Sequence, residues 1–423
     1  MAGRIANDTC DLAIVGAGAA GLAAAIFSAR ADPTLRILLL DGAKKPGAKI
    51  LVSGGGRCNV TNVRVTEQDF WGGRSTIVRR VLRAWPVDAT VAFFREVGVP
   101  LHEEEDGKLF PDSNRARDVL NALLSEAGRV GVELRADHRV TAITQSQPGF
   151  QIATTHGDVH ANRIVLATGG QSLPKSGSDG SGFAIARALG HTIVQTTPAL
   201  APLVLPRDEP LHQQLSGVAQ DVELAIWIHD AIAIRLRGAL LWTHFGVSGP
   251  VVLNASRHWL RAQIEQRRVA ITVNFAGGRL FEEVEAEWTR AAREHPRTSV
   301  QTTLAKSMPA SVASAVANAL AIDGNQSLAH FPRGDRRRLA HALVAWPLPI
   351  EGTRGYNFAE ATAGGVALSE IDPSTMESRV VKGVYLVGEM LDVDGRIGGF
   401  NFQWAWCSGF VAGRAVARGA ARA

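Results

Sequence analysis

A glycine-rich turn near the start of the chain limits the fold more than any other feature. An apolar strand is expected over residues 11–15, and it runs directly into Gly16-Ala17-Gly18-Ala19-Ala20-Gly21. An alanine-rich helix pattern follows from Ala20 to Arg30, and a second strand over residues 36–40 ends at Asp41. Strand, glycine turn, helix and strand in this order predict a Rossmann-type βαβ unit.

The residues of this turn suit a dinucleotide. Gly16 permits the tight turn, Gly18 lets the backbone approach a pyrophosphate, and Gly21 lets the helix pack closely on the sheet. The helix opens at Ala19 and Ala20, where free N–H groups and the positive end of the helix dipole face the phosphates. Asp41 is placed to accept hydrogen bonds from a ribose 2′-hydroxyl, which disfavours NADP at this site. The alternative is a glycine-rich turn without a ligand.

Two later strands are expected to end beside this turn. One runs into Thr168-Gly169-Gly170, and the last runs into Gly388-Glu389. Both ends should lie at the carboxyl edge of the same sheet, where cofactors bind. The segment from Gly388 to Asn401 is longer than an NAD site requires. FAD needs such a segment, because its ribityl chain and ring extend further from the first glycine turn than NAD does. The sequence therefore predicts FAD.

The segment after the last strand supplies candidate contacts to the ribityl chain and the flavin ring. We expect Glu389 or Asp394 to accept hydrogen bonds from ribityl hydroxyls, and Gly399 to place a backbone N–H group by the ring. For Asp394 the alternative is a solvated acidic loop. Phe400 and Asn401 complete this set of candidates.

A third glycine-rich stretch, Ser53 to Asn59, predicts a loop that lies against a flat or anionic group. Arg57 could pair with the pyrophosphate, and Asn59 could bond the flavin edge. Cys58 is a catalytic candidate, because a thiol beside a flavin can donate a proton or form an adduct; the alternative is a buried structural cysteine. The remaining cofactor candidates nearby are Lys49, Ser53, Gly54 and Gly55.

The stretch Thr243 to Pro250 contains the second catalytic candidate, His244. Histidine side chains exchange protons near neutral pH, so His244 could act as a general acid or orient a substrate if the stretch folds over the flavin. The alternative is a structural hydrogen bond.

The order of elements predicts an α/β fold, in which a Rossmann-type FAD-binding domain is interrupted by a β-rich plus helical insert. Alternating residues over 222–228 and 231–236 indicate antiparallel strands, and residues 279–345 are mainly helical in pattern. We expect residues 1–194 to begin the FAD-binding domain, residues 195–350 to form the insert, and residues 351–423 to complete the first domain.

Composition narrows the partners and the compartment. The chain of 423 residues has a net charge of +5. This is a mild preference for anionic partners and does not indicate DNA binding. The three cysteines are too scattered for a disulfide framework or a zinc site, so we expect no metal and a cytoplasmic location. We also expect no membrane span, and no signal peptide over residues 1–10. The sequence leaves the oligomeric state open.

Several blocks of the sequence resemble the family of FAD flavoproteins called aminoacetone-oxidase-like or BaiN-like. The most specific are Ser-Gly-Gly-Gly-Arg-Cys-Asn at 53–59 and Leu-Asp-Val-Asp-Gly at 391–395, and the matching blocks span nearly the whole chain. The chain departs from the family at Asp41, where relatives often carry Glu, and at Phe400, where Tyr is more usual. The resemblance implies a Rossmann FAD domain, a small β-rich part and a helical cap.

The resemblance also implies redox chemistry, for which three alternatives stand. In the first, FAD reduced by transiently docked NADH or NADPH delivers a hydride to an unsaturated substrate. Relatives suggest uridine in ribosomal RNA, giving dihydrouridine, or steroid or amine substrates. The second is an oxidase or reductase of a small amine or steroid-like molecule. The third is a flavin-bound RNA-binding factor without turnover, and the Arg336-Arg337-Arg338 cluster is the observation behind this hypothesis. The alternative is that the cluster forms a solvated face of the protein.

Overall fold

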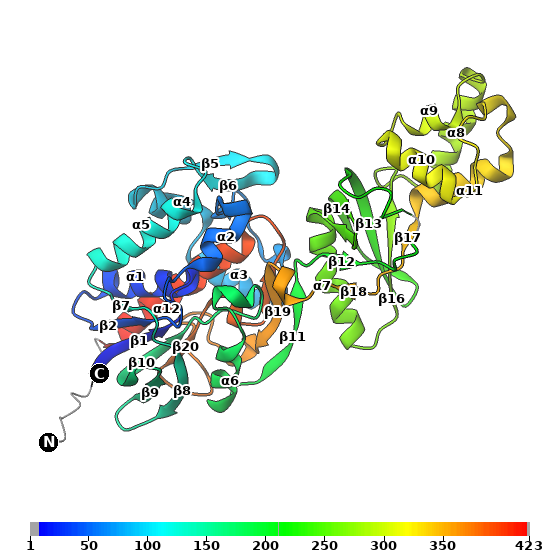
Figure 1. Cartoon of the computed structure of the whole chain (residues 1–423). Helices are drawn as coiled ribbons and strands as arrows, with labels where there is room; N and C mark the ends of the chain where they lie inside the picture. The colour runs from blue at the N-terminus through cyan, green and yellow to red at the C-terminus, as the bar shows by residue number, and fades with distance from the viewer. Residues whose placement is uncertain (1–7, 210, 421–423) are drawn as a thin grey trace. The chain divides into compact units, whose positions relative to one another are not determined.

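A computed structural model of the chain describes residues 8–209 and 211–420. It divides into two compact units (Figure 1). The first unit contains the described residues up to Thr197 together with those from Glu360 onwards, and the second contains Pro198–Ala359. The expected division into residues 1–194, 195–350 and 351–423 stays a prediction.

The first unit is built on a seven-stranded sheet in the order β7-β2-β1-β10-β9-β8, with β20 also paired to β10. The strands are β1 Asp8–Val15, β2 Ile37–Leu40, β7 Glu133–Arg135, β8 Val140–Gln145, β9 Phe150–Thr154, β10 Gly157–Leu166 and β20 Val384–Leu386. β2, β1, β10 and β20 run parallel, and their buried apolar runs are typical of a sheet covered on both faces.

β10 changes partner halfway along its length. Its first half pairs antiparallel with β9, and its second half pairs parallel with β20. This change leaves room for a strand from the far end of the sequence next to the first βαβ unit. The predicted meeting of the strand ends at Val15, Leu166 and Leu386 on one edge of the sheet is confirmed.

The two helices that pack most extensively on each other are the first and the last. α1 spans Ala19–Ala31 and α12 spans Phe400–Ala420 (Figure 1). Two glycines of α12 face α1 where there is no room for a side chain: a Cβ at Gly409 would lie 2.7 Å from the Ala20 carbonyl oxygen, and one at Gly413 would lie 2.8 Å from the Ser28 nitrogen. The close approach fixes the C-terminal segment against the start of α1.

Smaller elements complete the first unit. The helices are α2 Ala48–Gly56, α3 Ser75–Ala84, α4 Val87–Glu96, α5 Ala116–Arg129 and α6 Ser181–Ala188. β3 Thr61–Asn62, β6 Lys108–Pro111 and β5 Leu101–Glu104 form one small sheet, while β4 Phe70–Gly72 pairs with β21 Val393–Gly395, and β11 Ile193–Ala199 pairs with β19 Ala361–Val366.

The second unit combines a sheet with a group of helices. Its seven strands lie in the order β17-β16-β13-β14-β15-β12-β18. They are β12 Leu203–Val204, β13 Ala219–Ile228, β14 Ala231–Thr243, β15 Gly246–Ser248, β16 Val269–Asn274, β17 Trp346–Leu348 and β18 Gly352–Thr353. The helices are α7 Pro250–Ile264, α8 Phe281–Glu294, α9 Val300–Leu304, α10 Ala310–Ala319 and α11 Arg333–Val344. The expected β-rich and helical parts of the insert are both present.

Pro86 divides the helical stretch after β4 into two helices, because it cannot continue α3 and serves as the N-cap of α4. The stretch Thr243 to Pro250, expected as a loop, is a two-residue β14–β15 hairpin followed by the first turn of α7.

No helix within the described ranges is long and apolar enough to cross a membrane. The expectation of no signal peptide concerns residues 1–10, of which residues 1–7 lie outside the described ones.

Candidate functional site

The glycine turn has the geometry that a pyrophosphate requires. A Cβ at Gly16 would lie 2.5 Å from the Ala167 carbonyl oxygen, and one at Gly21 would lie 1.8 Å from the Gly16 carbonyl oxygen, so both positions are closed to side chains by the protein itself. A Cβ at Gly18 would meet nothing within 4 Å. Gly18 is the N-cap of α1, where no side chain caps the helix and the first turn has no acidic residue. This open helix end fits an anionic ligand.

Asp41 lies at the end of β2 and holds the same turn. Its carboxylate accepts hydrogen bonds from the Ala17 N–H at 2.7 Å and from the Ala43 N–H at 2.8 Å. Each carboxylate oxygen has a further lone pair, so Asp41 can also accept from a ribose hydroxyl. The predicted ribose contact is compatible with this second, structural role.

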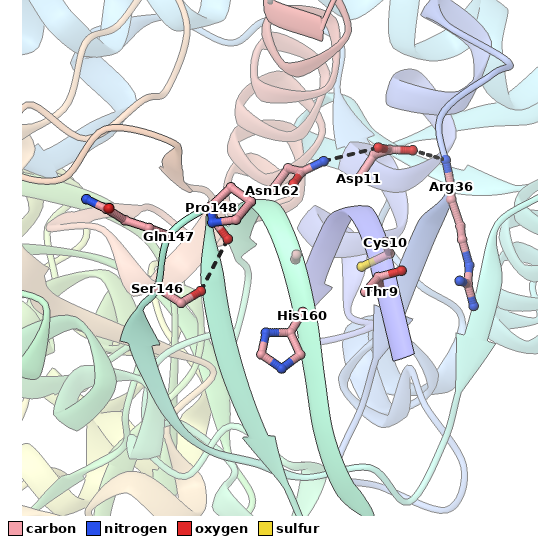
Figure 2. A pocket seen from close by; sticks show the side chains of 10 residues that line it. Thr9, Cys10, Asp11, Arg36, Ser146, Gln147, Pro148, His160 and Asn162 are labelled. Carbon is pink, nitrogen blue, oxygen red and sulfur yellow. Dashed lines mark hydrogen bonds between the residues drawn. The ribbon is translucent and has the colours of Figure 1, made fainter. Parts of the chain in front are cut away.

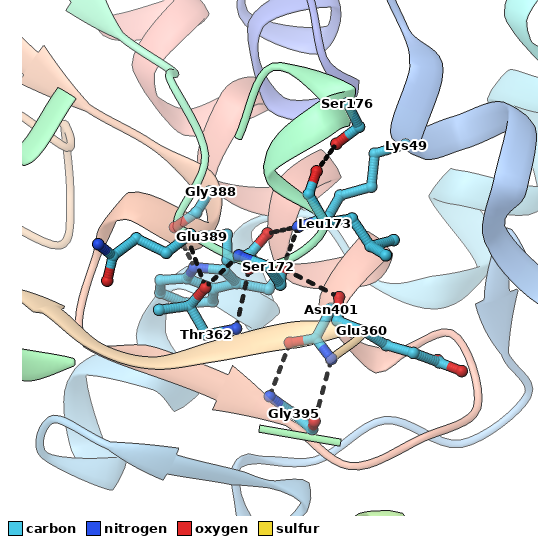
Figure 3. Close-up of polar contacts among 12 residues, drawn as sticks. Lys49, Ser172, Leu173, Ser176, Glu360, Thr362, Gly388, Glu389, Gly395 and Asn401 are labelled. Carbon is cyan, nitrogen blue, oxygen red and sulfur yellow. Dashed lines mark hydrogen bonds and ion pairs between the residues drawn. The ribbon is translucent and has the colours of Figure 1, made fainter. Parts of the chain in front are cut away.

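A polar network joins four segments at the carboxyl edge of the sheet (Figure 3). The Glu389 carboxylate pairs with the Lys49 ammonium and accepts hydrogen bonds from the Ser172 hydroxyl at 2.8 Å and the Thr362 N–H at 2.9 Å. Lys49 also donates to the Ser172 hydroxyl at 2.5 Å. The predicted candidates Lys49 and Glu389 are therefore brought together. Glu389 is expected to bind ribityl hydroxyls in addition to these partners.

The other strand-end candidates lie next to the glycine turn. Gly388 has φ +72°, and a Cβ there would lie 2.7 Å from the Ala20 Cβ, so the last strand ends directly against the start of α1. Thr168 and Gly169 follow β10, which pairs with both β1 and β20. Gly16, Gly18, Ala19, Ala20, Gly21, Thr168, Gly169 and Gly388 are thus gathered at one edge of the sheet.

The stretch Ser53 to Asn59 differs from the expected loop. Ser53, Gly54 and Gly55 belong to the irregular end of α2, in which both glycines have positive φ. Arg57 pairs with Glu104 at 2.6 Å and lies 4.1 Å over the Phe110 ring, so its guanidinium is already neutralised within the protein. The expected pairing of Arg57 with the pyrophosphate is not supported by this arrangement.

The candidate contacts after the last strand are also engaged within the protein. The Asn59 side-chain amide, oriented to satisfy its neighbours, accepts from the Gly399 N–H at 3.1 Å, which uses two groups that were expected to face the flavin. The Asn401 amide donates to and accepts from the Gly395 backbone. Asp394 and Phe400 are each 1% exposed. A solvated acidic loop is wrong for Asp394, because β21 pairs with β4.

Cys58 is completely buried, and burial raises the pKa of its thiol to about 12. Cys10 and Cys407 are also buried, with thiol pKa values raised to about 12. These environments favour the structural alternative for Cys58, because a reactive thiol needs exposure and a lowered pKa.

We therefore expect the folded chain to resist thiol reagents. At pH 8 the three thiols of the folded protein should react with Ellman's reagent on the order of a hundredfold more slowly than those of the urea-unfolded chain, because only the unfolded thiols approach a pKa of about 8.5. Stopped-flow absorbance measures both rates, and Cys58→Ser should leave the slow native rate unchanged. A fast single-thiol phase lost in Cys58→Ser would instead support the catalytic role.

His244 lies in the second unit at the β14–β15 hairpin, where it is exposed and contacts the Phe245 ring edge-on at a centroid distance of 5.1 Å. The nearby glycines approach backbone rather than an open space: a Cβ at Gly246 would lie 2.4 Å from the Leu203 oxygen, and one at Gly249 would lie 2.6 Å from the Ala239 oxygen. Their conformations are thus explained by strand packing. The catalytic role of His244 stays a prediction.

A hollow of about 580 Å³ lies elsewhere in the first unit (Figure 2). It is lined by the first half of β1, including Cys10 and Asp11, by the middle of β10, including His160, by the turn at 146–148, and by Arg36. The Asp11 carboxylate accepts from the Arg36 N–H at 2.9 Å and from the Asn162 amide at 3.2 Å. Because ligands of open α/β sheets bind at the carboxyl ends of the strands, this hollow is not the dinucleotide site.

Residues 10–415 match the family described as HI0933-like protein Rossmann domain. The chain belongs to this family of FAD-binding Rossmann proteins. Family membership makes it one of the FAD-dependent oxidoreductases, and the open helix end at Gly18 fits this cofactor.

Two relatives cover almost the whole chain. A 3-dehydro-bile acid delta(4,6)-reductase of Clostridium scindens is 33% identical over 96% of this chain and 98% of its own length. A ribosomal RNA dihydrouridine synthase of Escherichia coli is 34% identical over 95% of this chain and 96% of its own length. Among solved structures, E. coli quinol fumarate reductase FrdA has a TM-score of 0.52 at 17% identity, covering 98% of this chain and 71% of that one, which is a likeness of fold alone.

Sequence reasoning missed two members of the network around Glu389. Ser172 and Thr362 hold its carboxylate, and the Thr362 hydroxyl accepts from the Gln171 and Ser172 N–H groups at 2.8 and 3.1 Å. Ser172 follows the Thr168-Gly169-Gly170 turn by two residues, which was an available signal. Thr362 lies inside a buried apolar strand and carried no comparable signal.

Proposed function

We propose that this protein uses NADH or NADPH to reduce a carbon–carbon double bond conjugated with a carbonyl group, and that uridine in ribosomal RNA is its substrate. The observation that supports the proposal is the shared chemistry in the names of the two relatives. A 3-dehydro-delta(4,6) steroid acid and uridine both contain a double bond conjugated with a carbonyl. The same reaction therefore links two otherwise unlike substrates.

Different residues of the chain are assigned to cofactor binding and to proton donation. The glycine turn and Asp41 bind and orient the adenosine and pyrophosphate end of the cofactor, and the Lys49–Glu389 network positions its ribityl end. When bound, FAD supplies the hydride chemistry. A conjugated double bond that takes a hydride at one carbon takes a proton at the other, so a proton donor is also needed. His244 is our candidate for this donor.

Support for RNA as the substrate rests more on the relatives than on the arginine cluster. Arg337 lies 3.4 Å from Glu285, and Arg338 lies 2.7 Å from Asp335, both on or beside α11. Partnered arginines attract a phosphate backbone less than free ones. The solvated alternative for the cluster gains support from these pairs.

Mass spectrometry of ribosomal RNA nucleosides from cells with and without the gene tests the substrate. We expect dihydrouridine in ribosomal RNA to decrease when the gene is absent and to return with a plasmid copy. In parallel, the FAD-loaded protein is reduced anaerobically with NADH or NADPH and mixed with unmodified ribosomal RNA, a 3-oxo-delta(4,6) steroid acid, or oxygen. The oxidised protein is mixed separately with a small amine, which would reduce the flavin if the protein were an amine oxidase. Reoxidation by the steroid acid alone, or by oxygen alone, would contradict the RNA proposal.

His244→Ala separates the two half-reactions. We expect the variant to slow substrate reduction by about a hundredfold, the usual contribution of a general acid, while flavin reduction by NAD(P)H changes less than twofold. Stopped-flow absorbance near 450 nm measures both steps. His244→Gln serves as a control that keeps a hydrogen-bond donor. Equal slowing of both half-reactions would remove His244 from the proton-donor role.

A further inference from the structure

One arginine of the second unit is held against two aromatic rings. The guanidinium carbon of Arg354 lies 3.5 Å from the centroid of the Phe358 ring and 4.5 Å from that of the Phe245 ring. Phe358 is 46% exposed, so this stack lies at the surface of the unit. Among the described residues, the Arg354 side chain has neither a hydrogen-bond partner nor a carboxylate partner.

Several other arginines that lie over an aromatic ring are also paired with a carboxylate. Arg57, Arg337 and Arg396 each lie over one aromatic ring, and each also binds a carboxylate: Glu104, Glu285 and Asp69 respectively. Stacking in those cases accompanies an ion pair. Arg414, over the Phe410 ring at 5.4 Å, has no carboxylate partner among the described residues, but Arg354 differs from it in lying over two rings. Arg354 has a second ring in place of the carboxylate, so its charge is left for a ligand.

The position of the two rings determines which part of the Arg354 guanidinium can bind a ligand. Aromatic rings attract a guanidinium through its face. The N–H groups point outwards in the guanidinium plane, where they form a fork that matches the two oxygens of a carboxylate or phosphate. Because its guanidinium carbon lies over two rings, Arg354 is better suited to bind an oxyanion through its N–H groups than to stack on a nucleobase.

The backbone holds this arrangement from both sides. Arg354 follows β18, and its N–H donates to the Pro202 carbonyl at 3.2 Å. The next residue, Gly355, has φ +71° and donates its N–H to the Thr353 hydroxyl at 2.8 Å. Phe245 belongs to the β14–β15 hairpin turn, whose other turn residue is His244. The arginine stack and the proposed proton donor therefore share one turn.

We propose that Arg354, clamped by Phe245 and Phe358, binds an oxyanion of the substrate and orients it beside His244. This assignment rests on the proposed function only for the identity of that substrate. The oxyanion is a phosphodiester if the substrate is RNA and a carboxylate if it is a small acid. In either case the rings restrict the side chain before binding, which lowers the entropy lost on binding.

Side-chain NMR of the FAD-loaded, ¹⁵N-arginine-labelled protein tests the binding directly. The Arg354 Nε–H signal is identified by its loss in Arg354→Lys, and we expect ring currents to place it upfield of the other arginine signals. Dimethyl phosphate and acetate are the two probes. We expect saturable shifts of this signal with one probe, whose dissociation constant rises about tenfold in Phe358→Leu. Isothermal titration, which does not depend on the Arg354 signal, should detect no binding of the same probe to Arg354→Lys. Arg333→Lys, an exposed arginine on α11, is the matched control and should leave the constant unchanged.

The outcomes are distinct. Preference for dimethyl phosphate assigns the oxyanion to RNA, and preference for acetate assigns it to a small acid. With the matching substrate, Arg354→Lys should raise KM about tenfold and leave kcat within twofold. Absence of saturable binding, or an equal constant in wild type and Arg354→Lys, would overturn the site. Binding through Arg354 in a protein that reduces neither ribosomal RNA nor the steroid acid would instead overturn the proposed function and leave the site standing.

Discussion

Gly18→Val should give a folded protein that does not retain FAD. The new side chain meets no protein atom, because a Cβ at Gly18 has nothing within 4 Å, and the backbone there is extended, which valine tolerates. Its methyl groups would fill the space left for the pyrophosphate. Loss of two charge-assisted hydrogen bonds at about 2 kcal/mol each would weaken FAD binding by on the order of a thousandfold.

Absorbance at 450 nm after gel filtration measures the FAD that is retained, and isothermal titration measures the affinity. Stability must be compared between cofactor-free samples, since bound FAD itself raises the melting temperature. Gly128→Val is the matched control, because Gly128 also has open space around it but lies on α5. A Gly18→Val protein as yellow as wild type would place the pyrophosphate elsewhere.

Gly21→Ala should differ from Gly18→Val, because it should destabilise the fold itself rather than weaken FAD binding to a folded protein. The added Cβ would lie 1.8 Å from the Gly16 carbonyl oxygen and 3.3 Å from the Ala167 Cβ. Neither can move away easily, since the first is backbone in the tight turn and the second is in the core. We expect a loss of about 3 kcal/mol or more in the free energy of unfolding.

Urea unfolding of cofactor-free protein, followed by circular dichroism, measures this loss. Gly128→Ala controls for the general effect of alanine and should stabilise by up to about 1 kcal/mol, because alanine is the better helix former. Stability equal to wild type in Gly21→Ala would mean that α1 packs less closely on the turn than the distances indicate.

The sequence predicted the parts of this fold that local patterns determine. The βαβ unit and the antiparallel β13–β14 pair follow from short-range periodicity and glycine spacing, and both are confirmed. The gathering of Gly16, Thr168 and Gly388 at one edge could also be predicted, because parallel strands share their carboxyl ends.

What escaped prediction depends on contacts between distant segments. Three contacts follow from tertiary packing, which no local pattern encodes. They are the ion pair of Arg57 with Glu104 and the hydrogen bonds of Asn401 with Gly395 and of Glu389 with Ser172. The prediction for Thr243 to Pro250 was wrong about its backbone structure for a related reason. Its glycines suggested a ligand-binding loop, whereas their partners are the backbones of β12 and β14.

The packing of α12 on α1 has a consequence for how the protein is made. α1 is buried along most of its length, and one of its faces is covered by α12, which the ribosome produces long after α1. At ordinary elongation rates the two are separated by on the order of half a minute of synthesis. During that interval the nascent chain carries an uncovered apolar helix next to an unfinished sheet, which is a state that chaperones recognise. Cofactor loading is then expected to follow the synthesis of α12, so cells starved of riboflavin should accumulate colourless chains that contain α12 rather than chains arrested before it.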